Sequence, residues 1–446
     1  MRKPETGNRK LETDYRPVIG LEVHVQAKTR SKMFCGCPAD TFGKKPNSVV
    51  CPVCLGLPGA IPVPNRAAIE KTIALAKALG CRITKFSQFE RKNYFYPDLP
   101  KGFQISQYEH PIGVEGKLLG FAVSRVHLEE DTGKLLHEGG QTFIDFNRSG
   151  VPLVEIVTEP EFEDPARVSE FLKELRLLVV NADISDADME KGSMRLEANV
   201  SLKKSGSKKL PGYKVELKNI NSFAFLKKAL EVEIERQGKL LKSGKQPHQE
   251  TRGFDPKRGV TVAQRTKEEA FDYRYFPEPD IPPLEKILVQ KVTRTKTITA
   301  DAILVESPEK IREKYRSQGL SAQYTEVLVG NPKLARIFEE VSAKIPADEA
   351  ANIIVNRRFG DPLRLGVKKL IAAYEKERKK EVLSGDKLLP TAKRVVADNP
   401  RAVSDYRQGK TAALKFLLGQ LMRETDGKMD PKVGELILKK LCDART

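Results

Sequence analysis

The sequence lacks long apolar runs and the common nucleotide-binding signatures. No apolar run approaches the roughly 18 residues of a membrane span, so we expect no membrane association. Residues 1–16 are charged and contain no apolar core of a secretory signal, which predicts a cytoplasmic protein with reduced thiols. No G-x-x-x-x-G-K-[ST] loop, dinucleotide fingerprint or protein-kinase motif occurs. If the chain handles ATP, it must do so with carboxylates, a metal ion and arginines on a sheet surface.

The chain is large and basic. Its 446 residues allow two or three domains, and 39% apolar and 31% charged residues indicate a globular protein. The net charge is 78 − 60 = +18, and residues 286–446 hold 33 basic and 21 acidic residues, which is +12 of that total. A basic C-terminal region suggests a polyanionic partner such as RNA. The alternative is that this positive charge serves only to keep the protein soluble and has no specific partner.

One stretch, Arg91–Gln107, combines aromatic residues with cations and prolines. Tyr94, Phe95 and Tyr96 follow Arg91 and Lys92, and two prolines then flank Asp98. Each proline fixes its own φ and removes an N–H donor, so a rigid bend is expected. Aromatics and cations on a stiff loop suit an anionic, planar ligand, and a well-packed surface turn is the alternative. Segment 272–280 has a similar mixture of residues and is the expected counterpart of this stretch.

Two predicted strands carry candidate metal ligands. In Val18–Gln26 the apolar and polar residues alternate, which places Glu22 and His24 together on one face. In Val151–Val157 both the odd-numbered and the even-numbered positions are mostly apolar. We therefore expect a strand covered on both faces, with Glu155 buried in its middle. A buried carboxylate needs a partner, and with Glu22, His24 and Glu130 in the same presumed sheet we favour a metal over a simple salt bridge.

A third group of polar residues lies at the end of another predicted strand, 124–130. His127, Glu129, Glu130 and Asp131 crowd together there. They could bind a metal, although surface turns are often acidic as well.

Four cysteines form a zinc pattern. Thirteen residues separate the pair Cys35 and Cys37 from the pair Cys51 and Cys54, so each closely spaced pair could reach one tetrahedral ion. A reducing compartment disfavours disulfides. Because all four ligands are protein thiolates, such a zinc ion would be structural rather than catalytic.

Helical periodicity dominates after about residue 284. Residues 367–381 predict a charged helix, and 383–391, with Gly385 and Pro390, a linker. A small basic helical bundle is expected at 399–441, suited to binding RNA or a protein.

Several of these stretches together resemble the B subunit of the aspartyl/glutamyl-tRNA(Asn/Gln) amidotransferases. The stretches that carry the resemblance are VIGLEVHVQ (18–26), RKNYFYPDLPKGFQISQ (91–107), HLEEDTGK (127–134), DFNRSGVPLVEIVTEP (145–160), ELKNINSF (216–223), QETRGFD (249–255), DYRYFPEPD (272–280) and DYRQGKTAALKFLLGQLM (405–422). The resemblance covers nearly the whole chain.

The resemblance implies an ATP-dependent carbon–nitrogen ligase with glutamine as amido donor. The B subunit would phosphorylate the side-chain carboxylate of mischarged Glu-tRNA(Gln) or Asp-tRNA(Asn). Ammonia from an amidase A subunit would then displace the phosphate, and a small C subunit would complete a heterotrimer. ATP, Mg²⁺ and a structural Zn²⁺ are the implied cofactors.

The resemblance also implies an α+β fold. Residues 1–290 would form a catalytic domain with a glutamine-synthetase-like antiparallel sheet and a zinc knuckle at 35–54, residues 291–388 an all-α region, and residues 389–446 a tRNA-binding helical tail domain. The implied catalytic metal ligands are Glu22, His24, Glu130 and Glu155. Candidates for binding ATP or the substrate are Arg91, Lys92, Tyr94, Tyr96 and Arg274.

Two other function classes remain open at this point. A non-catalytic RNA-binding module with a structural zinc would bind tRNA whether or not Glu155 is intact. A stand-alone metal-dependent ligase would use free ammonia and need no A subunit.

Overall fold

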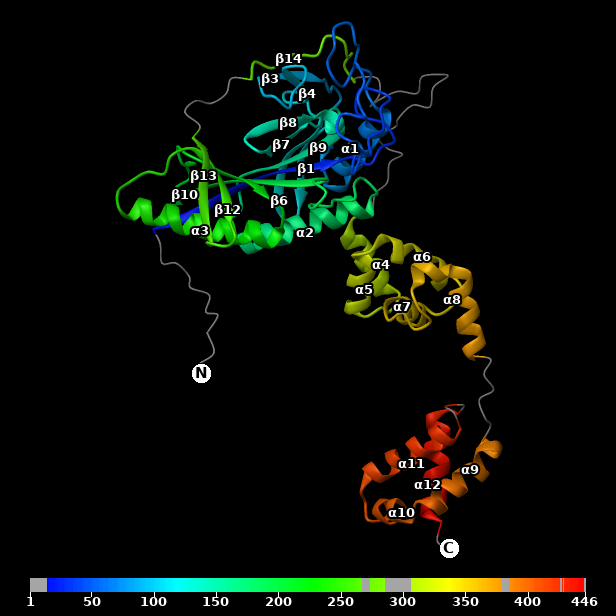
Figure 1. The fold of residues 1–446 in the computed structure, drawn as a ribbon. Coiled ribbons are helices and arrows are strands. Elements are labelled where there is room, and N and C mark those ends of the chain that lie inside the picture. The colour runs from blue at the N-terminus through cyan, green and yellow to red at the C-terminus, as the bar shows by residue number, and fades with distance from the viewer. Residues whose placement is uncertain are drawn as a thin grey trace. The chain divides into compact units, whose positions relative to one another are not determined.

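The computed structural model describes residues 14–266, 273–284, 306–378, 385–425, 427 and 429–444. The chain divides into two compact units (Figure 1). One holds the chain up to Ser317 together with Val329–Pro332, and the other holds Gln318–Leu328 with Lys333–Thr446. The predicted domain boundary at 290/291 lies outside the described residues.

A nine-stranded sheet forms the centre of the first unit. Its strands, in spatial order, are β13 (Val260–Thr266), β12 (Glu250–Asp255), β11 (Val215–Ile220), β10 (Met194–Lys204), β1 (Tyr15–Gln26), β9 (Pro152–Thr158), β6 (Phe121–Glu130), β5 (Gly113–Leu118) and β2 (Arg82–Ile83). All neighbours are antiparallel except β11 and β12, which are parallel. The predicted α+β class is therefore confirmed.

Three helices share a core with this sheet: α1 (Arg66–Ala78), α2 (Pro165–Asn181) and α3 (Phe223–Lys242). The Asn65 side chain caps α1 by accepting a hydrogen bond from the Ala68 amide, and Asp164 caps α2 in the same way. Pro165 occupies the first position of α2, where a missing N–H is not needed. These local signals explain where α1 and α2 begin.

Strand β1 shows how the sheet separates core from site. Its odd-numbered residues from Ile19 to Val25 are almost fully buried and join the core with the helices. Its even-numbered residues from Glu22 to Gln26, which include His24, are partly accessible on the other face. The alternation predicted for this strand is thus confirmed, and it leaves one face of the sheet polar.

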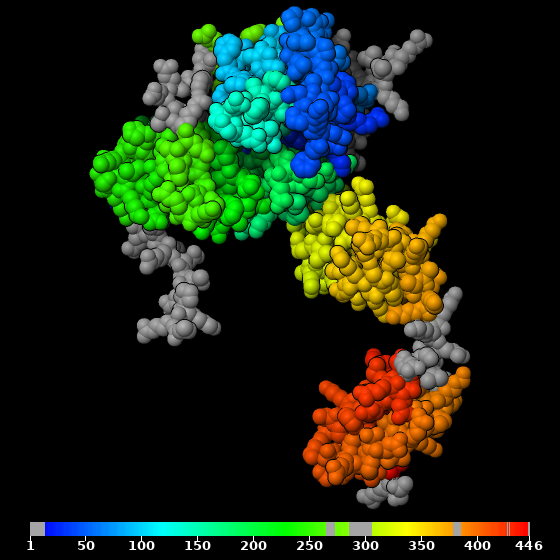
Figure 2. Space-filling model, in the orientation of Figure 1, coloured from blue at the N-terminus to red at the C-terminus, as the bar shows by residue number. Residues whose placement is uncertain are grey.

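A second, three-stranded sheet consists of β14 (Phe276–Pro277), β3 (Glu90–Asn93) and β4 (Phe103–Ser106). It lies beside the β7–β8 hairpin (Lys134–Glu138 and Gln141–Asp145) in Figure 1. A short helix, η1 (Phe146–Arg148), follows the hairpin. In Figure 2 the blue and cyan segments that carry β3, β4 and the loop with the four cysteines (residues 35–54, hereafter the cysteine loop) form one continuous surface. The small sheet joins two stretches that lie 276 − 106 = 170 positions apart in sequence, residues 90–106 and 276–277.

The first unit ends in helix α4 (Pro308–Ser317), which α2 anchors. Arg312 makes two hydrogen bonds to the Glu174 carboxylate, of 2.8 and 3.0 Å, and both side chains are largely buried. Bidentate pairs of this kind fix geometry as well as charge.

The second unit is helical. Its helices are α5 (Ala322–Val329, whose last residue belongs to the first unit), α6 (Pro332–Ser342), α7 (Ala347–Val355), α8 (Pro362–Arg378), α9 (Gly385–Asp398), α10 (Pro400–Arg407), α11 (Thr411–Glu424) and α12 (Pro431–Asp443). Helices α9–α12 enclose a core of their own. No helix among the described residues is long and apolar enough to cross a membrane.

The linker predicted for 383–391 is wrong from Gly385 onward, because helix α9 begins there and includes Pro390. Leu388, Ala392 and Val395 are buried along one side of α9, and this apolar stripe outweighs the proline signal. The predicted domain boundary at 388/389 consequently falls inside a helix.

Candidate active site and metal-binding clusters

Four polar side chains form a row across the polar face of the large sheet. Arg195 of β10 pairs with His24 of β1, His24 pairs with Glu155 of β9, and Glu155 pairs with His127 of β6. Residues directly opposite one another in antiparallel strands point to the same face. The register alone therefore gathers a guanidinium, two imidazoles and a carboxylate from four separate strands.

The centre of this row could hold a metal ion. Ligand atoms of His24, Glu129 and Glu155 all lie within 4.8 Å of one another. The His24 Nε2 atom is 3.5 Å from a Glu129 oxygen and 3.6 Å from a Glu155 oxygen, and His127 Nε2 is 3.0 Å from Glu155. Two carboxylates suit Mg²⁺ or Mn²⁺, and the imidazole adds a nitrogen donor.

The electrostatics of this cluster favour charged side chains. Burial by itself would lower the pKa of His24, but the Glu155, Glu129 and Glu197 carboxylates together raise that pKa to about 9. Burial would raise the pKa of Glu155, yet His127 and His24 hold it well below its usual range. Glu155 is thus a buried anion whose neighbours compensate its charge, which is the state that a carboxylate ligand requires, whereas His24 would have to release its proton to bind a metal ion.

The structure brings Glu129 rather than Glu130 to this cluster. Glu130 is the next residue on β6, so its side chain turns to the opposite side of the strand. There it contacts the Lys101 ammonium and accepts a 3.0 Å hydrogen bond from the Ile105 amide. In this structure the predicted ligand Glu130 therefore lies apart from His24 and Glu155.

Glu22 shares the polar face with His24 but lies outside the three-residue cluster. It accepts a 3.0 Å hydrogen bond from the Asn199 side chain. Burial, followed by the Glu155 and Glu197 carboxylates, raises the pKa of Glu22. A carboxylate among other carboxylates is a place where a cation would be stabilised.

The Arg91–Gln107 stretch supplies strands β3 and β4 of the small sheet and the bend between them. Arg91 forms two hydrogen bonds to the buried carboxylate of Glu278, of 2.7 and 2.8 Å, and lies over the Phe103 ring. Its guanidinium therefore holds β14 against β3. Segment 272–280, the expected counterpart of this stretch, lies against it in its described part, because β14 pairs with β3.

Lys92, the neighbour of Arg91, faces the metal-binding cluster. Burial would lower its pKa, but Glu129 leads a group of neighbours, including Glu155, that raises it. Its ammonium lies 4.9 Å from the centre of the Tyr273 ring and 5.9 Å from that of Tyr94. Lys92 is accordingly a cation held between aromatic rings near two carboxylates.

The other substrate-binding candidates lie nearer the surface. Tyr96 is half exposed, and Phe95 beside it is almost fully exposed. Arg274 is exposed and has a positive φ of 44°, and its carbonyl accepts a 2.8 Å hydrogen bond from the Asn93 side chain. Tyr96, Phe95 and Arg274 are therefore reached from solvent.

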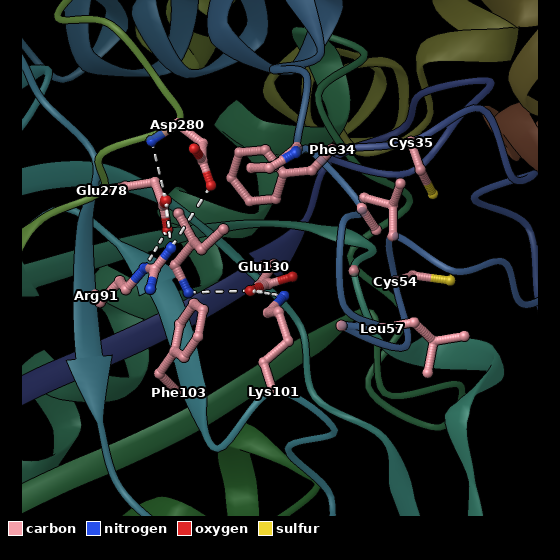
Figure 3. A pocket seen from close by; sticks show the side chains of 16 residues that line it. Phe34, Cys35, Cys54, Leu57, Arg91, Lys101, Phe103, Glu130, Glu278 and Asp280 are labelled. Atoms are coloured by element: carbon pink, nitrogen blue, oxygen red, sulfur yellow. Dashed lines mark hydrogen bonds and ion pairs between the residues drawn. The ribbon is translucent and has the colours of Figure 1, made fainter.

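A cavity of about 200 Å³ lies on the other side of Glu130 (Figure 3). Its walls come from the cysteine loop, from strands β3 and β4, and from the segment after β14. Lys101 and Glu130 meet at its wall, opposite Leu57 and Cys54. It is thus a mixed polar and apolar space, apart from the row of His24 and Glu155.

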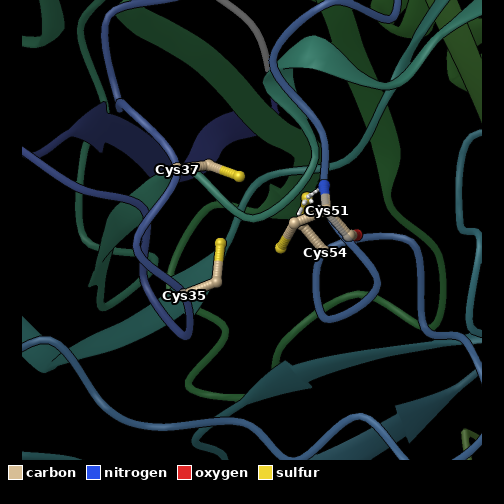
Figure 4. Close-up of side chains that lie close together, drawn as sticks. All are labelled: Cys35, Cys37, Cys51 and Cys54. Atoms are coloured by element: carbon tan, nitrogen blue, oxygen red, sulfur yellow. Dashed lines mark hydrogen bonds between the residues drawn. The ribbon is translucent and has the colours of Figure 1, made fainter.

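The four cysteines of the predicted zinc site converge on one point (Figure 4). Sulfur atoms of Cys35, Cys37, Cys51 and Cys54 lie within 4.8 Å of one another, and those of Cys51 and Cys54 are 3.8 Å apart. Zn–S bonds of about 2.3 Å in a tetrahedron place the sulfurs roughly 3.8 Å apart. The cluster therefore fits a structural metal ion.

A buried lysine accompanies the cysteines. The Lys32 ammonium is 3.6 Å from the Cys54 sulfur and donates a 2.8 Å hydrogen bond to the Val49 carbonyl. The Cys35 thiol leads the groups that lower the pKa of Cys54 to about 4, and the Cys51 amide and Lys32 act in the same direction. A site with four thiolates carries excess negative charge around Zn²⁺, which this lysine offsets.

The sequence placed Glu129 and His127 in a polar group that could bind a metal but did not select them as ligands, and it gave Arg195 no role. The alternation of side chains along β6 was the available signal. His127 and Glu129 are two residues apart and must therefore lie on the same face of the strand. The position of Arg195 opposite His24 depends on the strand order and register, for which the sequence carries no comparable signal.

Comparison with known proteins gives a consistent result. Residues 17–290 match the model of the GatB/GatE catalytic domain, and residues 367–442 match that of the GatB domain. The chain is 42% identical to the B subunit of the aspartyl/glutamyl-tRNA(Asn/Gln) amidotransferase of Thermus thermophilus, with 96% of this chain and 99% of that one covered. The protein of the same name from Thermotoga maritima is 40% identical, with the same coverage.

Proposed function

The chain belongs to the family of B subunits of aspartyl/glutamyl-tRNA(Asn/Gln) amidotransferases, and we propose that it amidates mischarged Glu-tRNA(Gln), Asp-tRNA(Asn) or both. In this proposal it is an ATP-dependent carbon–nitrogen ligase that uses glutamine as amido donor. The observation that carries the proposal is the row of acidic and basic side chains on the polar face of the sheet, with His24, Glu129 and Glu155 at its centre.

The first step is activation of the side-chain carboxylate of the misacylated residue. Two anions, ATP and a carboxylate, must approach each other, so the site has to offset negative charge. His24, Glu129 and Glu155, with Glu22 beside them, would hold a Mg²⁺ ion, which would supply part of that positive charge. The sheet holds these ligands rigidly, because each belongs to a paired strand.

The small sheet contributes cations from the other side. Lys92 lies near Glu129 and Glu155 and supplies a fixed positive charge close to the cluster. Arg274, Tyr94 and Tyr96 are candidates for contacts to ATP or to the acyl end of the tRNA. Arg91 acts indirectly, because the Glu278 carboxylate already occupies its guanidinium.

The second step needs ammonia, which we propose an amidase A subunit releases from glutamine. A small C subunit would complete a cytoplasmic heterotrimer that serves translation. The names of the similar proteins specify a B subunit of an amidotransferase, which supports the need for partner subunits. Residues 1–290 would carry the catalysis, and the helical residues 291–388 and 389–446 would contact the tRNA.

The cysteine cluster has a separate, structural role in this proposal. Zn²⁺ bound by Cys35, Cys37, Cys51 and Cys54 would leave no open coordination position. It would hold the loop that forms one wall of the cavity beside Glu130.

The decisive experiment uses the complex of this chain with its A and C subunits. With ATP, glutamine and mischarged tRNA, we expect Gln-tRNA(Gln) or Asn-tRNA(Asn) and one ADP per product. Glu155→Gln should reduce product formation by at least about 100-fold, while tRNA binding in a gel-shift assay stays within about twofold. Absence of product from the wild-type complex would contradict the proposal. Full activity of Glu155→Gln would support a non-catalytic role for this chain.

A further inference from the structure

Arg195 lies at one end of the polar row, next to the metal-binding cluster. It is directly opposite His24 in the β1–β10 pairing and therefore points to the same face. Its side chain is 31% exposed, so a ligand on that face can reach it. No other arginine occupies the row formed by His24, Glu155 and His127 in the described strands.

A buried carboxylate fixes the position of Arg195. The Asp131 side chain is almost fully buried and accepts a 2.9 Å hydrogen bond from the Arg195 guanidinium. Gln26 donates a 2.8 Å hydrogen bond to the other Asp131 oxygen, and Arg148 lies 3.6 Å from the first. Asp131 is therefore held from several sides, which leaves Arg195 little freedom to turn away.

Most of the Arg195 donors remain available. A guanidinium has five N–H donors, and among the described residues this one donates to Asp131 alone. Arg91 differs, because Glu278 engages it with two hydrogen bonds. Glu197, two residues from Arg195 on the same face, is paired with Lys218 at 2.9 Å. The remaining donors of Arg195 therefore lie beside the cluster, where a ligand can accept hydrogen bonds from them.

We propose that Arg195 is a catalytic residue that binds the phosphoryl group during its transfer, and that Asp131 is the positioning residue that orients it. The inference rests on the proposed function and deepens it. A planar guanidinium can donate two parallel hydrogen bonds to phosphate oxygens, which an ammonium cannot.

The step is a transfer of the γ-phosphoryl group. A carboxylate oxygen of the Glu or Asp side chain forms a bond to the γ-phosphorus. The bond from that phosphorus to the β–γ bridging oxygen breaks, and ADP leaves with the electron pair. Ammonia then attacks the carbonyl carbon, inorganic phosphate leaves, and the nitrogen loses a proton. Arg195 binds the equatorial phosphoryl oxygens while the first bond forms and the second breaks.

The test compares three variants of the complex. Arg195→Gln removes both the positive charge and the paired N–H donors of the planar guanidinium. Arg195→Lys keeps a positive charge opposite Asp131 but loses those paired donors. The matched control is Arg236→Gln on α3, because Arg236 has similar exposure, 26%, and pairs with the buried Glu233 away from the site. We measure tRNA-dependent ADP formation, tRNA binding and the melting temperature of each.

We expect kcat for ADP formation to fall by about 100-fold or more in Arg195→Gln and by at least about 10-fold in Arg195→Lys. Binding of mischarged tRNA should stay within about twofold of wild type in both, and Arg236→Gln should keep wild-type kcat. A further variant, Arg195→Ala, should regain part of its activity when millimolar guanidinium is added.

Two results would overturn the inference. One is a kcat in both Arg195 variants that equals that of Arg236→Gln. The other is a loss of kcat that only accompanies an equal loss of tRNA binding or of melting temperature. A wild-type complex that forms no ADP with mischarged tRNA would instead refute the proposed function itself, so the two failures are distinguishable.

Discussion

At the scale of single residues, one step along β6 decides what a carboxylate does. Glu129 and Glu130 are adjacent and chemically almost the same, but successive side chains of a strand point to opposite faces. Glu129 consequently lies with His24 and Glu155, whereas Glu130 contacts Lys101 in the wall of the cavity. The two residues should therefore respond differently to the same substitution.

We predict that Glu129→Gln weakens Mn²⁺ binding by at least about 10-fold, because it removes an anionic ligand. Glu130→Gln should keep Mn²⁺ affinity but lower the free energy of unfolding by about 3 kcal/mol, because it leaves the Lys101 ammonium unpaired in a mostly buried position. Calorimetric titration with Mn²⁺ and urea denaturation measure the two effects. If Glu130→Gln weakened Mn²⁺ binding and Glu129→Gln did not, Glu130 rather than Glu129 would be the metal ligand.

At the scale of elements, short loops held by side chains build the walls of the site. The cysteine loop is tied to the start of α1, because the Asn65 side chain that caps the helix also donates to the carbonyls of Ser31 and Lys32. A metal ion at the four cysteines would close the same loop from its other end. Helix cap and metal site thus act on one wall of the cavity.

We predict that Cys51→Ser lowers the zinc content of the purified chain well below one ion per molecule, because a tetrahedral site loses one thiolate. Cys81→Ser is the matched control, since Cys81 is a buried thiol outside the cluster. Metal analysis by mass spectrometry compares the two. Undiminished zinc in Cys51→Ser would exclude the four-thiolate site.

At the scale of the whole molecule, separate cores make separate folding units. Helices α9–α12 bury Leu388, Leu417 and Leu438 among themselves, and this cluster is distinct from the core of the large sheet. A domain that encloses its own core can fold alone. The residues of this bundle also belong to the basic part of the chain, which is consistent with a role in tRNA binding.

We predict that the fragment 385–446 folds by itself into a helical bundle with a cooperative thermal transition. Leu417→Asp should abolish that transition, because Leu417 is fully buried, whereas Leu436→Asp should change it little, because Leu436 is more than half exposed. Far-ultraviolet circular dichroism follows both variants. A fragment without cooperative melting would show that the bundle depends on the rest of the chain.

Much of the architecture could be read from local patterns. The alternation of β1 and the spacing of the four cysteines each specify a short segment, and the structure confirms both. Asp164 and Pro165 begin α2 by the same kind of local signal. Local signals succeed because backbone geometry and capping act over a few residues. The linker predicted from Pro390 was wrong, because the buried apolar side of helix α9 stabilises the helix more than one proline destabilises it.

The sequence by itself determined the α+β class, the zinc pattern and the placement of Glu22 and His24 on one face of a strand. Only the tertiary structure decided that Glu129 replaces Glu130 in the cluster, that Arg91 is occupied by Glu278, and that Arg195 stands beside His24. The physical reason is register: which side chains meet depends on how distant strands pair, and a shift of one residue would turn every one of them to the other face.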